Sequence, residues 1–312
     1  MRIEYHRTLI ADRVRNEAFY AALKAVIVPG KTVVADIGAG TGLLGLMASK
    51  LGAKSVYLFE TAAVASVAEK IIKANRVKNC HLIPCHSTDF TDRLQADVIV
   101  SETLGNYAFE ENIIGTFNDA RTRFLKPGGT IIPSAITQYV APVIAPRIDK
   151  ELRAWLHAGH GIDLGVAQAM SFNNVYVRSL ATHELLDNGA SAAIWDTVDL
   201  TRDSKSTRKG EALWAIANPQ TIYGFACWWT ADLKPGPCLS TGPDAAKTHW
   251  EQLYFPLLEP IAAKTGEKIS VTLRSLSSEE AGTHLAWAAR QLDARGKQIA
   301  RQALDLDKGY LP

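Results

Sequence analysis

Cysteine is scarce in this sequence, with four among 312 residues. Cys80, Cys85, Cys227 and Cys238 are too few and too unevenly spaced to form a disulfide framework. They also lack the paired CxxC spacing that holds a structural zinc ion. The sequence therefore predicts buried or incidental thiols and no metal site.

Long apolar runs and a large excess of charge are missing as well. No stretch reaches the roughly 20 apolar residues of a membrane span, and the first residues lack the apolar core and cleavage site of a signal peptide. The net charge is only +2, which predicts neither a nucleic-acid coat nor a polybasic membrane contact. We therefore expect a cytoplasmic protein that binds no nucleic acid and no membrane.

The chain from Thr32 to Ile132 alternates short β-branched runs with helical patterns. The runs at 32–37, 55–59, 81–84, 96–101 and 129–133 are typical of buried strands, whereas 41–51, 62–75 and 110–125 are typical of helices. This alternation indicates βαβ units and hence an α/β fold with a doubly wound, mainly parallel sheet. We place this first domain at residues 1–133.

After Pro133 the pattern becomes β-rich. The segments 136–143, 220–229 and 268–275 are typical of strands, and turn-forming stretches such as 233–238 separate them. One helical insertion, near 161–186, interrupts this half of the chain. The sequence thus predicts a second, β-rich domain over residues 134–312.

A glycine-rich turn, Asp36–Gly42, follows the first predicted strand and opens a helix. Because glycine has no Cβ, the backbone at Gly38 and Gly40 can approach a ligand closely. Residues 40–45 match the GxGxxG pattern of dinucleotide sites, and Glu60 lies about where a ribose-binding acid is expected. On this match alone, a dinucleotide and S-adenosylmethionine are both candidate ligands.

Acidic residues at three successive strand ends favour S-adenosylmethionine. Asp36 precedes the first glycine by two residues, where it would repel a pyrophosphate but would pair with the methionine ammonium. Glu60 can accept both ribose hydroxyls, and Asp89 is placed to accept from the adenine amino group. Each acid taken singly is equally typical of a helix N-cap or a solvated loop. Together they predict an S-adenosylmethionine site.

Two further carboxylates follow the fourth predicted strand. Glu102 lies at its carboxyl end, and Glu111 comes nine residues later, after a loop through Gly105. Two such acids in one pocket repel each other unless a cation lies between them, and a guanidinium fits because its planar fork meets a carboxylate on each side. The alternative is that Glu102 binds loop amides while Glu110 and Glu111 stabilise a helix N-terminus. The residues themselves leave both readings open.

At these positions the sequence resembles the protein arginine methyltransferases. The resemblance extends in order over nearly the whole chain and is carried by separate motifs. These are the segment Asp12–Arg15, the glycine turn Asp36–Gly42, the double-glutamate loop Ser101–Glu111, the threonine–histidine–tryptophan loop Thr248–Trp250, and the short segment Lys264–Glu267.

The resemblance implies a Rossmann-like methyltransferase domain over 1–133 that binds S-adenosylmethionine. The residues implied for the cofactor are Arg15 at the methionine carboxylate, Asp36, Gly38 and Gly40 along the glycine turn, Glu60 at the ribose, and Thr88 and Asp89 at the adenine. Glu102 is implied as a further cofactor-binding residue. It also implies a barrel-like substrate domain over 134–312, in which the insertion near 161–186 is a helical arm that makes a homodimer.

For catalysis, the resemblance implies that Glu102 and Glu111 clamp the guanidinium of the substrate. It further implies that His249 pairs with Asp12 and that Trp250 helps to wall the substrate pocket.

The sequence also departs from the family pattern. Thr103-Leu104 stands where a bulky pair usually follows the first glutamate, Asn106 stands where an aromatic residue is usual, and Leu9 occupies a position that helps to set the product type. The N-terminal helix that caps the cofactor in the family is expected to be almost absent, because the sequence starts shortly before Leu9.

The leading hypothesis is therefore an enzyme that methylates a guanidino nitrogen of arginine, in a protein, a peptide or a small molecule. A second hypothesis is a methyltransferase of the same scaffold that acts on another small molecule. A catalytically silent dimeric binding module is a third, although the intact acids count against it. A nicotinamide oxidoreductase is disfavoured by the charge of Asp36.

Overall fold

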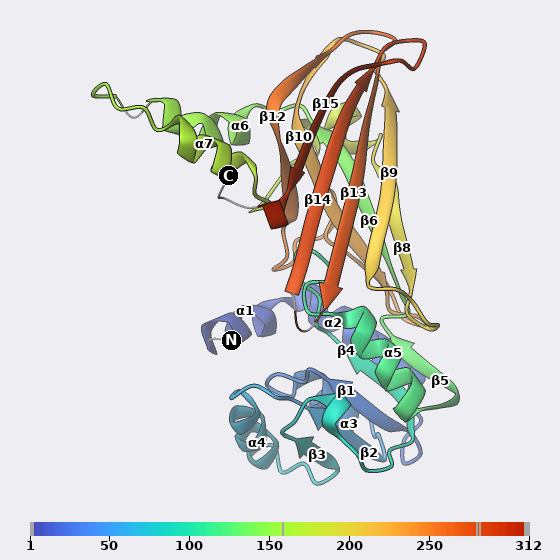
Figure 1. The fold of residues 1–312 in the computed structure, drawn as a ribbon. Helices are drawn as coiled ribbons and strands as arrows, with labels where there is room; N and C mark the ends of the chain where they lie inside the picture. The colour runs from blue at the N-terminus through green and yellow to red at the C-terminus, as the bar shows by residue number, and fades with distance from the viewer. Residues whose placement is uncertain (1–2, 158, 279, 281, 309–312) are drawn as a thin grey trace.

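The computed structural model describes residues 3–157, 159–278, 280 and 282–308. Its first part is a parallel sheet with helices packed around it (Figure 1). The strands are β1 (Val33–Ile37), β2 (Ser55–Phe59), β3 (Cys80–Ile83), β4 (Ala96–Ser101) and β5 (Leu125–Ile132), in the order β3-β2-β1-β4-β5. All the pairings between them are parallel. The predicted α/β fold is confirmed.

The helices of this part begin with two that the patterns did not predict. They are α1 (Ile3–Ala11), α2 (Arg13–Val26), α3 (Leu43–Lys50), α4 (Ala65–Ala74) and α5 (Ile113–Phe124). Helices α2 to α5 each bury apolar residues, for example Phe19 and Leu23 of α2. Helix α3 starts at Leu43 because Gly42 has a φ of 83°, a left-handed conformation outside the helix.

The second part is built from two antiparallel sheets (Figure 1). One contains β6 (Ala135–Val143), β7 (Tyr176–Arg178), β8 (Ala193–Asp199), β10 (Gln220–Asp232) and β12 (Gln252–Ala263) in the order β7-β12-β10-β6-β8, with β11 (Cys238–Ser240) beside β10. The other contains β9 (Thr207–Ala215), β13 (Lys268–Ser278), β14 (Gly282–Leu292) and β15 (Gln298–Asp305) in the order β15-β14-β13-β9. Their inner faces meet at Phe255 and Trp287, whose rings pack edge to face at 5.3 Å.

The helical insertion begins earlier than predicted. It consists of α6 (Arg147–Leu152), a 3₁₀ turn η2 (Arg153–His157) and α7 (Gly165–Phe172), and it projects from the barrel as an arm (Figure 1). Phe172 is buried and Arg153 stacks over its ring, which ties the two ends of the arm together. The predicted range 161–186 wrongly included residues 176–178, because these pair with β12 as strand β7. Short 3₁₀ turns occupy Thr182–Glu184, Leu186–Gly189 and Leu306–Lys308.

Two tryptophans of the barrel hold the loop that follows β4. The indole Nε1 of Trp229 donates to the carbonyl of Gly105 at 3.0 Å, and that of Trp250 donates to the carbonyl of Leu104 at 2.7 Å. The two rings also pack edge to face at 5.0 Å. One hydrophobic core therefore runs from the parallel sheet through this loop into the barrel. In the described part of the chain, no helix has the length and apolar character to cross a bilayer.

Trp229→Phe should lower the free energy of unfolding by about 1–3 kcal/mol beyond the loss of ring volume, because the buried Gly105 carbonyl loses its donor. Trp195→Phe is the matched control, since Trp195 is buried but its Nε1 has no partner among the described residues. Urea denaturation of both variants measures the difference. Equal losses in the two variants would contradict the assigned role of this hydrogen bond.

Candidate functional site

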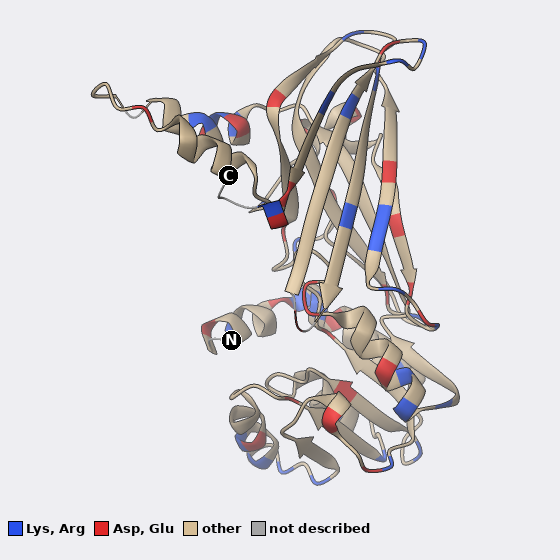
Figure 2. Ribbon diagram, viewed as in Figure 1, with Lys and Arg blue, Asp and Glu red and all other residues tan. Residues whose placement is uncertain are grey.

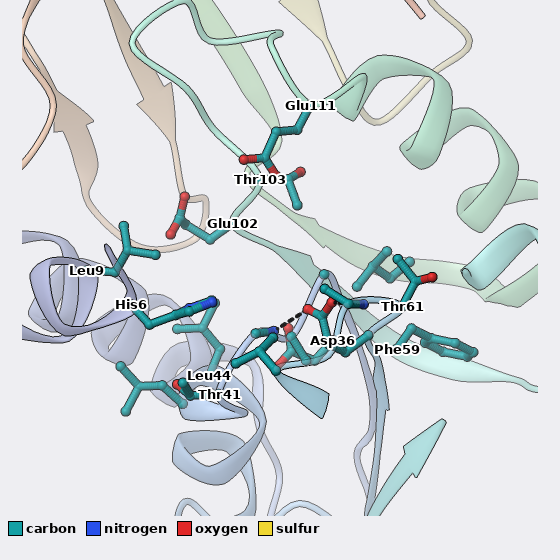
Figure 3. Close-up of a pocket in the computed structure, with 18 of the residues that line it drawn as sticks. His6, Leu9, Asp36, Thr41, Leu44, Phe59, Thr61, Glu102, Thr103 and Glu111 are labelled. Atoms are coloured by element: carbon teal, nitrogen blue, oxygen red, sulfur yellow. Dashed lines mark hydrogen bonds between the residues drawn. The ribbon is translucent and has the colours of Figure 1, made fainter. Parts of the chain in front are cut away.

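A pocket of about 330 Å³ lies at the carboxyl ends of the parallel strands, bordered by helix α1 (Figure 3). Strand ends β1, β2 and β4 contribute Asp36, Glu60 and Glu102 to its wall. Open α/β sheets bind their ligands at this edge. The pocket therefore coincides with the place where the sequence predicts the cofactor.

The glycine turn has the conformation that a close ligand approach requires. Gly38 and Gly40 have φ values of 70° and 57°, which are unfavourable for residues with a side chain. A Cβ on Gly38 would come within 2.5 Å of the methyl carbon of Thr103. Both glycines line the pocket, so their backbone forms its floor.

Asp36 is a buried carboxyl, 1% exposed, at the start of the glycine turn. Its Oδ2 accepts a hydrogen bond from the amide of Gly45 at 2.8 Å, near the beginning of helix α3 (Figure 3). Burial nevertheless raises the pKa of Asp36 to about 7, and the positive charge of Arg15 offsets this only in part. A ligand cation placed beside Asp36 would stabilise its ionised form.

Glu60 fastens the glycine turn to strand β2. Its Oε2 accepts from the amide of Gly40 and its Oε1 from the amide of Ala62, both at 2.7 Å. Each carboxylate oxygen keeps a further lone pair that can accept another donor. Glu60 lies on the pocket wall, where those lone pairs can meet a ligand.

Arg15 and Glu102 form a buried ion pair inside the site. Their side chains are 7% and 4% exposed, and both Nε and a terminal nitrogen of Arg15 contact Oε2 of Glu102. The other terminal nitrogen of Arg15 donates to Asn16 at 2.7 Å. The structure thus brings the residue predicted for the cofactor carboxylate against one of the two predicted substrate acids. An ion pair of this kind fixes the direction of both side chains.

Glu111 also lines the pocket, and Figure 3 shows it across from Glu102 with Thr103 between them. Burial raises the pKa of the Glu111 carboxyl, and the charges of Glu102 and Glu110 raise it further. Burial and the same acids also raise the pKa of Tyr5 on helix α1. These shifts indicate a space with an excess of negative charge.

Asp12 and His249 lie together, as the resemblance implies. Oδ2 of Asp12 accepts from the amide of His249 at 2.8 Å and lies 2.7 Å from its ring Nδ1. Oδ1 accepts from the amide of Arg15 at 2.9 Å, so Asp12 is also the N-cap of helix α2. Burial opposes ionisation of Asp12, but these hydrogen bonds outweigh it and lower its pKa. The ring of His249 lies 3.9 Å from that of Trp250.

Thr88 and Asp89 are not brought to the pocket wall. They are exposed residues of the 3₁₀ turn η1 (Ser87–Asp89), and the wall is formed instead by the residues just before them, Cys85, His86 and Ser87. Arg123 of helix α5 holds this turn by donating to the carbonyls of Ser87 and Phe90. The hydroxyl of Ser87 is buried without a partner among the described residues, which makes it a candidate that the sequence reasoning missed.

Helix α1 is the other missed contribution. The expectation that the N-terminal helix is almost absent is wrong, because Tyr5, His6 and Leu9 of α1 line the pocket. The ring Nε2 of His6 is buried without a partner in the described structure, and burial lowers the pKa of His6. The spacing of these residues, one helical turn apart, was the signal that could have predicted a pocket-facing helix.

Within the described ranges, no group of three or more His, Cys, Asp or Glu side chains is arranged to hold a metal ion. Asn106, one of the departures from the family pattern, has a structural contact: its side-chain oxygen accepts from the amide of Glu251 at 2.9 Å. This bond joins the double-glutamate loop to the loop that carries His249 and Trp250.

Two family models match adjoining parts of the chain. The model of ribosomal protein L11 methyltransferase (PrmA) matches residues 20–157. The model of the arginine methyltransferase oligomerization subdomain matches residues 134–288.

Whole-chain relatives agree with these matches. Protein arginine N-methyltransferase 6 of Danio rerio is 28% identical over 91% of this chain and 84% of its own length. Protein arginine N-methyltransferase 1 of Dictyostelium discoideum is 27% identical over 86% of this chain and 80% of its own length.

Solved structures share the fold over nearly the full length. The Trypanosoma brucei PRMT1 enzyme–prozyme heterotetrameric complex with AdoHcy contains a chain with a TM-score of 0.84 and 20% identity, covering 96% of this chain and 97% of that one. Protein arginine methyltransferase 10 of Arabidopsis thaliana has a TM-score of 0.82 and 22% identity, covering 98% of both chains. The family models and the whole-chain relatives support membership of the protein arginine N-methyltransferase family, and the solved structures share its fold.

Proposed function

We propose that this protein transfers a methyl group from S-adenosylmethionine to a guanidino nitrogen of arginine. The observation that carries the proposal is the pair Glu102 and Glu111, two acids that face one space at the pocket (Figure 3). Burial and the neighbouring acids raise the pKa of Glu111, so a cation between the two glutamates would favour its ionised form. A guanidinium meets that need and offers planar donors to both carboxylates. The relatives named as arginine N-methyltransferases support the same acceptor.

The residues around the pocket fit S-adenosylmethionine. Its ammonium would lie beside Asp36, whose pKa burial raises to about 7 despite the positive charge of Arg15. Its ribose hydroxyls would donate to the remaining lone pairs of Glu60, and its carboxylate would meet Arg15. The AdoHcy in the complex of the Trypanosoma brucei relative supports this cofactor. A nicotinamide dinucleotide fits less well, because its pyrophosphate would face the carboxylates of Asp36 and Glu60.

When bound, the cofactor supplies an electrophilic methyl group on a sulfonium. The task of the protein is to align the acceptor nitrogen and to exclude water. A free guanidinium is a poor nucleophile because it stays protonated at neutral pH. Carboxylates of Glu102 and Glu111 would hold the positive charge on the two nitrogens that they bind, leaving electron density on the third. The buried ion pair with Arg15 fixes the direction of Glu102 for this purpose.

The methylated product still carries one proton too many. We assign this proton to His249, because Asp12 fixes its Nδ1 while its Nε2 has no partner among the described residues. Asp12 stays ionised owing to its lowered pKa, so it would stabilise the imidazolium that forms. Trp250, in contact with the His249 ring, keeps this region closed to water.

We further propose that the arm makes a homodimer. Its 3₁₀ turn and the turn before α7 expose Trp155, Leu156 and Ile162, which are between 41% and 61% exposed. So many apolar side chains on one projecting element are unusual on a surface that stays in water. A second copy supplies a self-complementary partner through two-fold symmetry. The match to an oligomerization subdomain over 134–288 supports this assignment.

Glu111→Gln should abolish most turnover and leave S-adenosylmethionine binding nearly unchanged. The amide keeps the shape of the carboxylate but presents donors to a guanidinium that has only donors. Turnover is measured as label transferred from the cofactor to host-cell lysate, separated into protein and small-molecule pools, and cofactor binding is measured by calorimetry.

Glu110→Gln is the matched control, because it removes the same charge from the neighbouring residue while its amide oxygen can still accept from the amide of Tyr107. It should retain most of the turnover. Substantial activity in Glu111→Gln, on whichever acceptor the lysate contains, would contradict the guanidinium clamp and favour an acceptor without positive charge.

Cofactor affinity should fall as the pH is lowered from 7 to 5.5. The ammonium binds the ionised form of Asp36, so below its pKa of about 7 a proton must leave before binding. The dissociation constant should rise by up to about tenfold per pH unit in this range. In Asp36→Asn the affinity should be weaker at pH 7 and nearly independent of pH. A slope that persists in Asp36→Asn would assign the titration to another group, such as His6.

Light scattering should give about twice the chain mass of 34.0 kDa at micromolar concentration. Leu156→Asp with Ile162→Asp should give a monomer, because charges in a buried apolar interface are strongly unfavourable. Val28→Asp is the control, since Val28 is similarly exposed at 52% but lies outside the arm. A wild-type monomer, or a double variant that stays dimeric, would contradict the proposed interface.

A further inference from the structure

A second hollow lies between the arm and the barrel. It is a groove of about 880 Å³ lined by helix α7 and by the outer face of the sheet β9-β13-β14-β15. Val166 and Met170 of α7 form one wall. None of its lining residues belongs to the cofactor pocket.

Positive charge gathers in this groove. Five lining residues are basic and two are acidic, whereas the whole chain has 34 basic and 32 acidic residues. Lys209, Arg274, Arg301 and Lys308 are exposed, and no hydrogen bond or ion pair of their side chains occurs among the described residues. Figure 2 shows basic residues on the strands of this face. Four free cations on a concave surface are complementary to an anionic ligand.

The remaining charges of the groove are already engaged. Arg290 contacts the carboxylate of Glu211 and donates to the hydroxyl of Ser270 at 3.1 Å. The Asp305 carboxylate accepts from the amide of Asp307 at 3.0 Å. The Arg290–Glu211 pair therefore adds no net charge, and the four free cations outnumber the remaining carboxylate of Asp305.

The floor of the groove is flat because its side chains are small. Thr272, Ala288 and Ala303 lie directly opposite one another on β13, β14 and β15. Arg274 lies two residues beyond Thr272 along β13, and Arg301 two residues before Ala303 on β15. Since β13 and β15 run in the same direction, the two arginines stand about 13 Å apart along the strands. An extended peptide places its residues i and i+4 at this same spacing.

The groove is within reach of the proposed active site. Strand β14 begins beside the double-glutamate loop, where the hydroxyl of Thr283 donates to the carbonyl of Glu110 at 3.3 Å. Along β14, Ala286, opposite Arg274, is about 10 Å from Thr283, and Arg290 is about 23 Å away. A polypeptide leaving the space between Glu102 and Glu111 would therefore reach these cations with residues about four to eight positions from its arginine.

We propose that this groove binds an acidic segment of a polypeptide substrate, at a distance of several residues from the arginine that is methylated. The inference rests on the proposed function and names the class of its substrate. A single-stranded nucleic acid fits less well, because its bases need exposed aromatic side chains to stack on. The groove has one aromatic lining residue, Trp287, which is buried and donates its Nε1 to the carbonyl of Pro256.

Binding can be tested without catalysis. The probe is a fluorescein-labelled peptide in which glutamine replaces the arginine and four glutamates lie four to eight positions to either side of it. The wild-type dimer should bind it in an anisotropy titration, more tightly at low salt. Arg274→Glu with Arg301→Glu should weaken binding at least tenfold, because repulsion replaces attraction at two contacts. Lys24→Glu with Lys31→Glu is the control of equal charge on exposed residues outside the groove.

Three outcomes would overturn the proposal. In the first, the two double variants bind the peptide equally. In the second, the wild type binds a poly(dT) oligonucleotide more tightly than the peptide. In the third, Arg274→Glu/Arg301→Glu is a monomer in light scattering. The last result would show that a second copy occupies the groove. Each outcome is read from binding or mass alone, so it does not depend on whether the protein methylates arginine.

Turnover then tests the link to the active site. With arginine restored, the glutamate peptide should have a kcat/KM about tenfold higher than the same peptide with glutamines, mainly through KM. Arg274→Glu/Arg301→Glu should lose this difference and keep its activity on the glutamine peptide. Absence of turnover on every peptide would contradict the proposed function, whereas turnover without a glutamate preference in the wild type would contradict only the role of the groove.

Discussion

Asp12 has both carboxylate oxygens committed, and the geometry of the site depends on this. One oxygen caps helix α2 through the amide of Arg15, and the other binds the amide and the ring of His249. Because Arg15 is in turn paired with Glu102, the cap sets the direction of the acid at the end of β4. Residues from the N-terminal helices, the parallel sheet and the barrel are thereby fixed to one another through a single buried network. Such a network makes the residues that it joins rigid, and the Nε2 of His249 is left open among the described residues.

The charges of the pocket explain which ligands it can hold. Asp36, Glu60, Glu102 and Glu111 surround it, and Arg15 is the cation among its lining residues that is paired with one of them. Burial and the neighbouring acids raise the pKa values of Asp36 and Glu111, so ionisation of these two carboxyls is costly. Two cationic ligands relieve that cost at two places, one beside the glycine turn and one between the glutamates. A neutral acceptor would leave the second place uncompensated.

The sequence was sufficient for features that depend on local pattern. Buried β-branched strands and the glycine turn follow from residues that are neighbours in the chain, and so do the acids at the strand ends. It was insufficient where contacts between residues far apart in the sequence determine the position of a side chain or helix. Thr88 and Asp89 turn away from the pocket because Arg123, 36 residues after Ser87, holds the intervening turn by its carbonyls. Helix α1 has only nine residues, and although their spacing indicates a helix, its place over the pocket depends on tertiary contacts.

Net charge was the least informative of the sequence properties. A value of +2 averages an acidic pocket with a basic groove, and each of these acts on a ligand only within about 10 Å at physiological salt. The relevant quantity is therefore the charge of each surface. An arginine flanked by further basic residues would satisfy the glutamates but would be repelled by Arg274 and Arg301, whereas an arginine with acids at some distance is complementary to both surfaces. The groove would thus select a substrate by repulsion of the wrong sequence as much as by attraction of the right one.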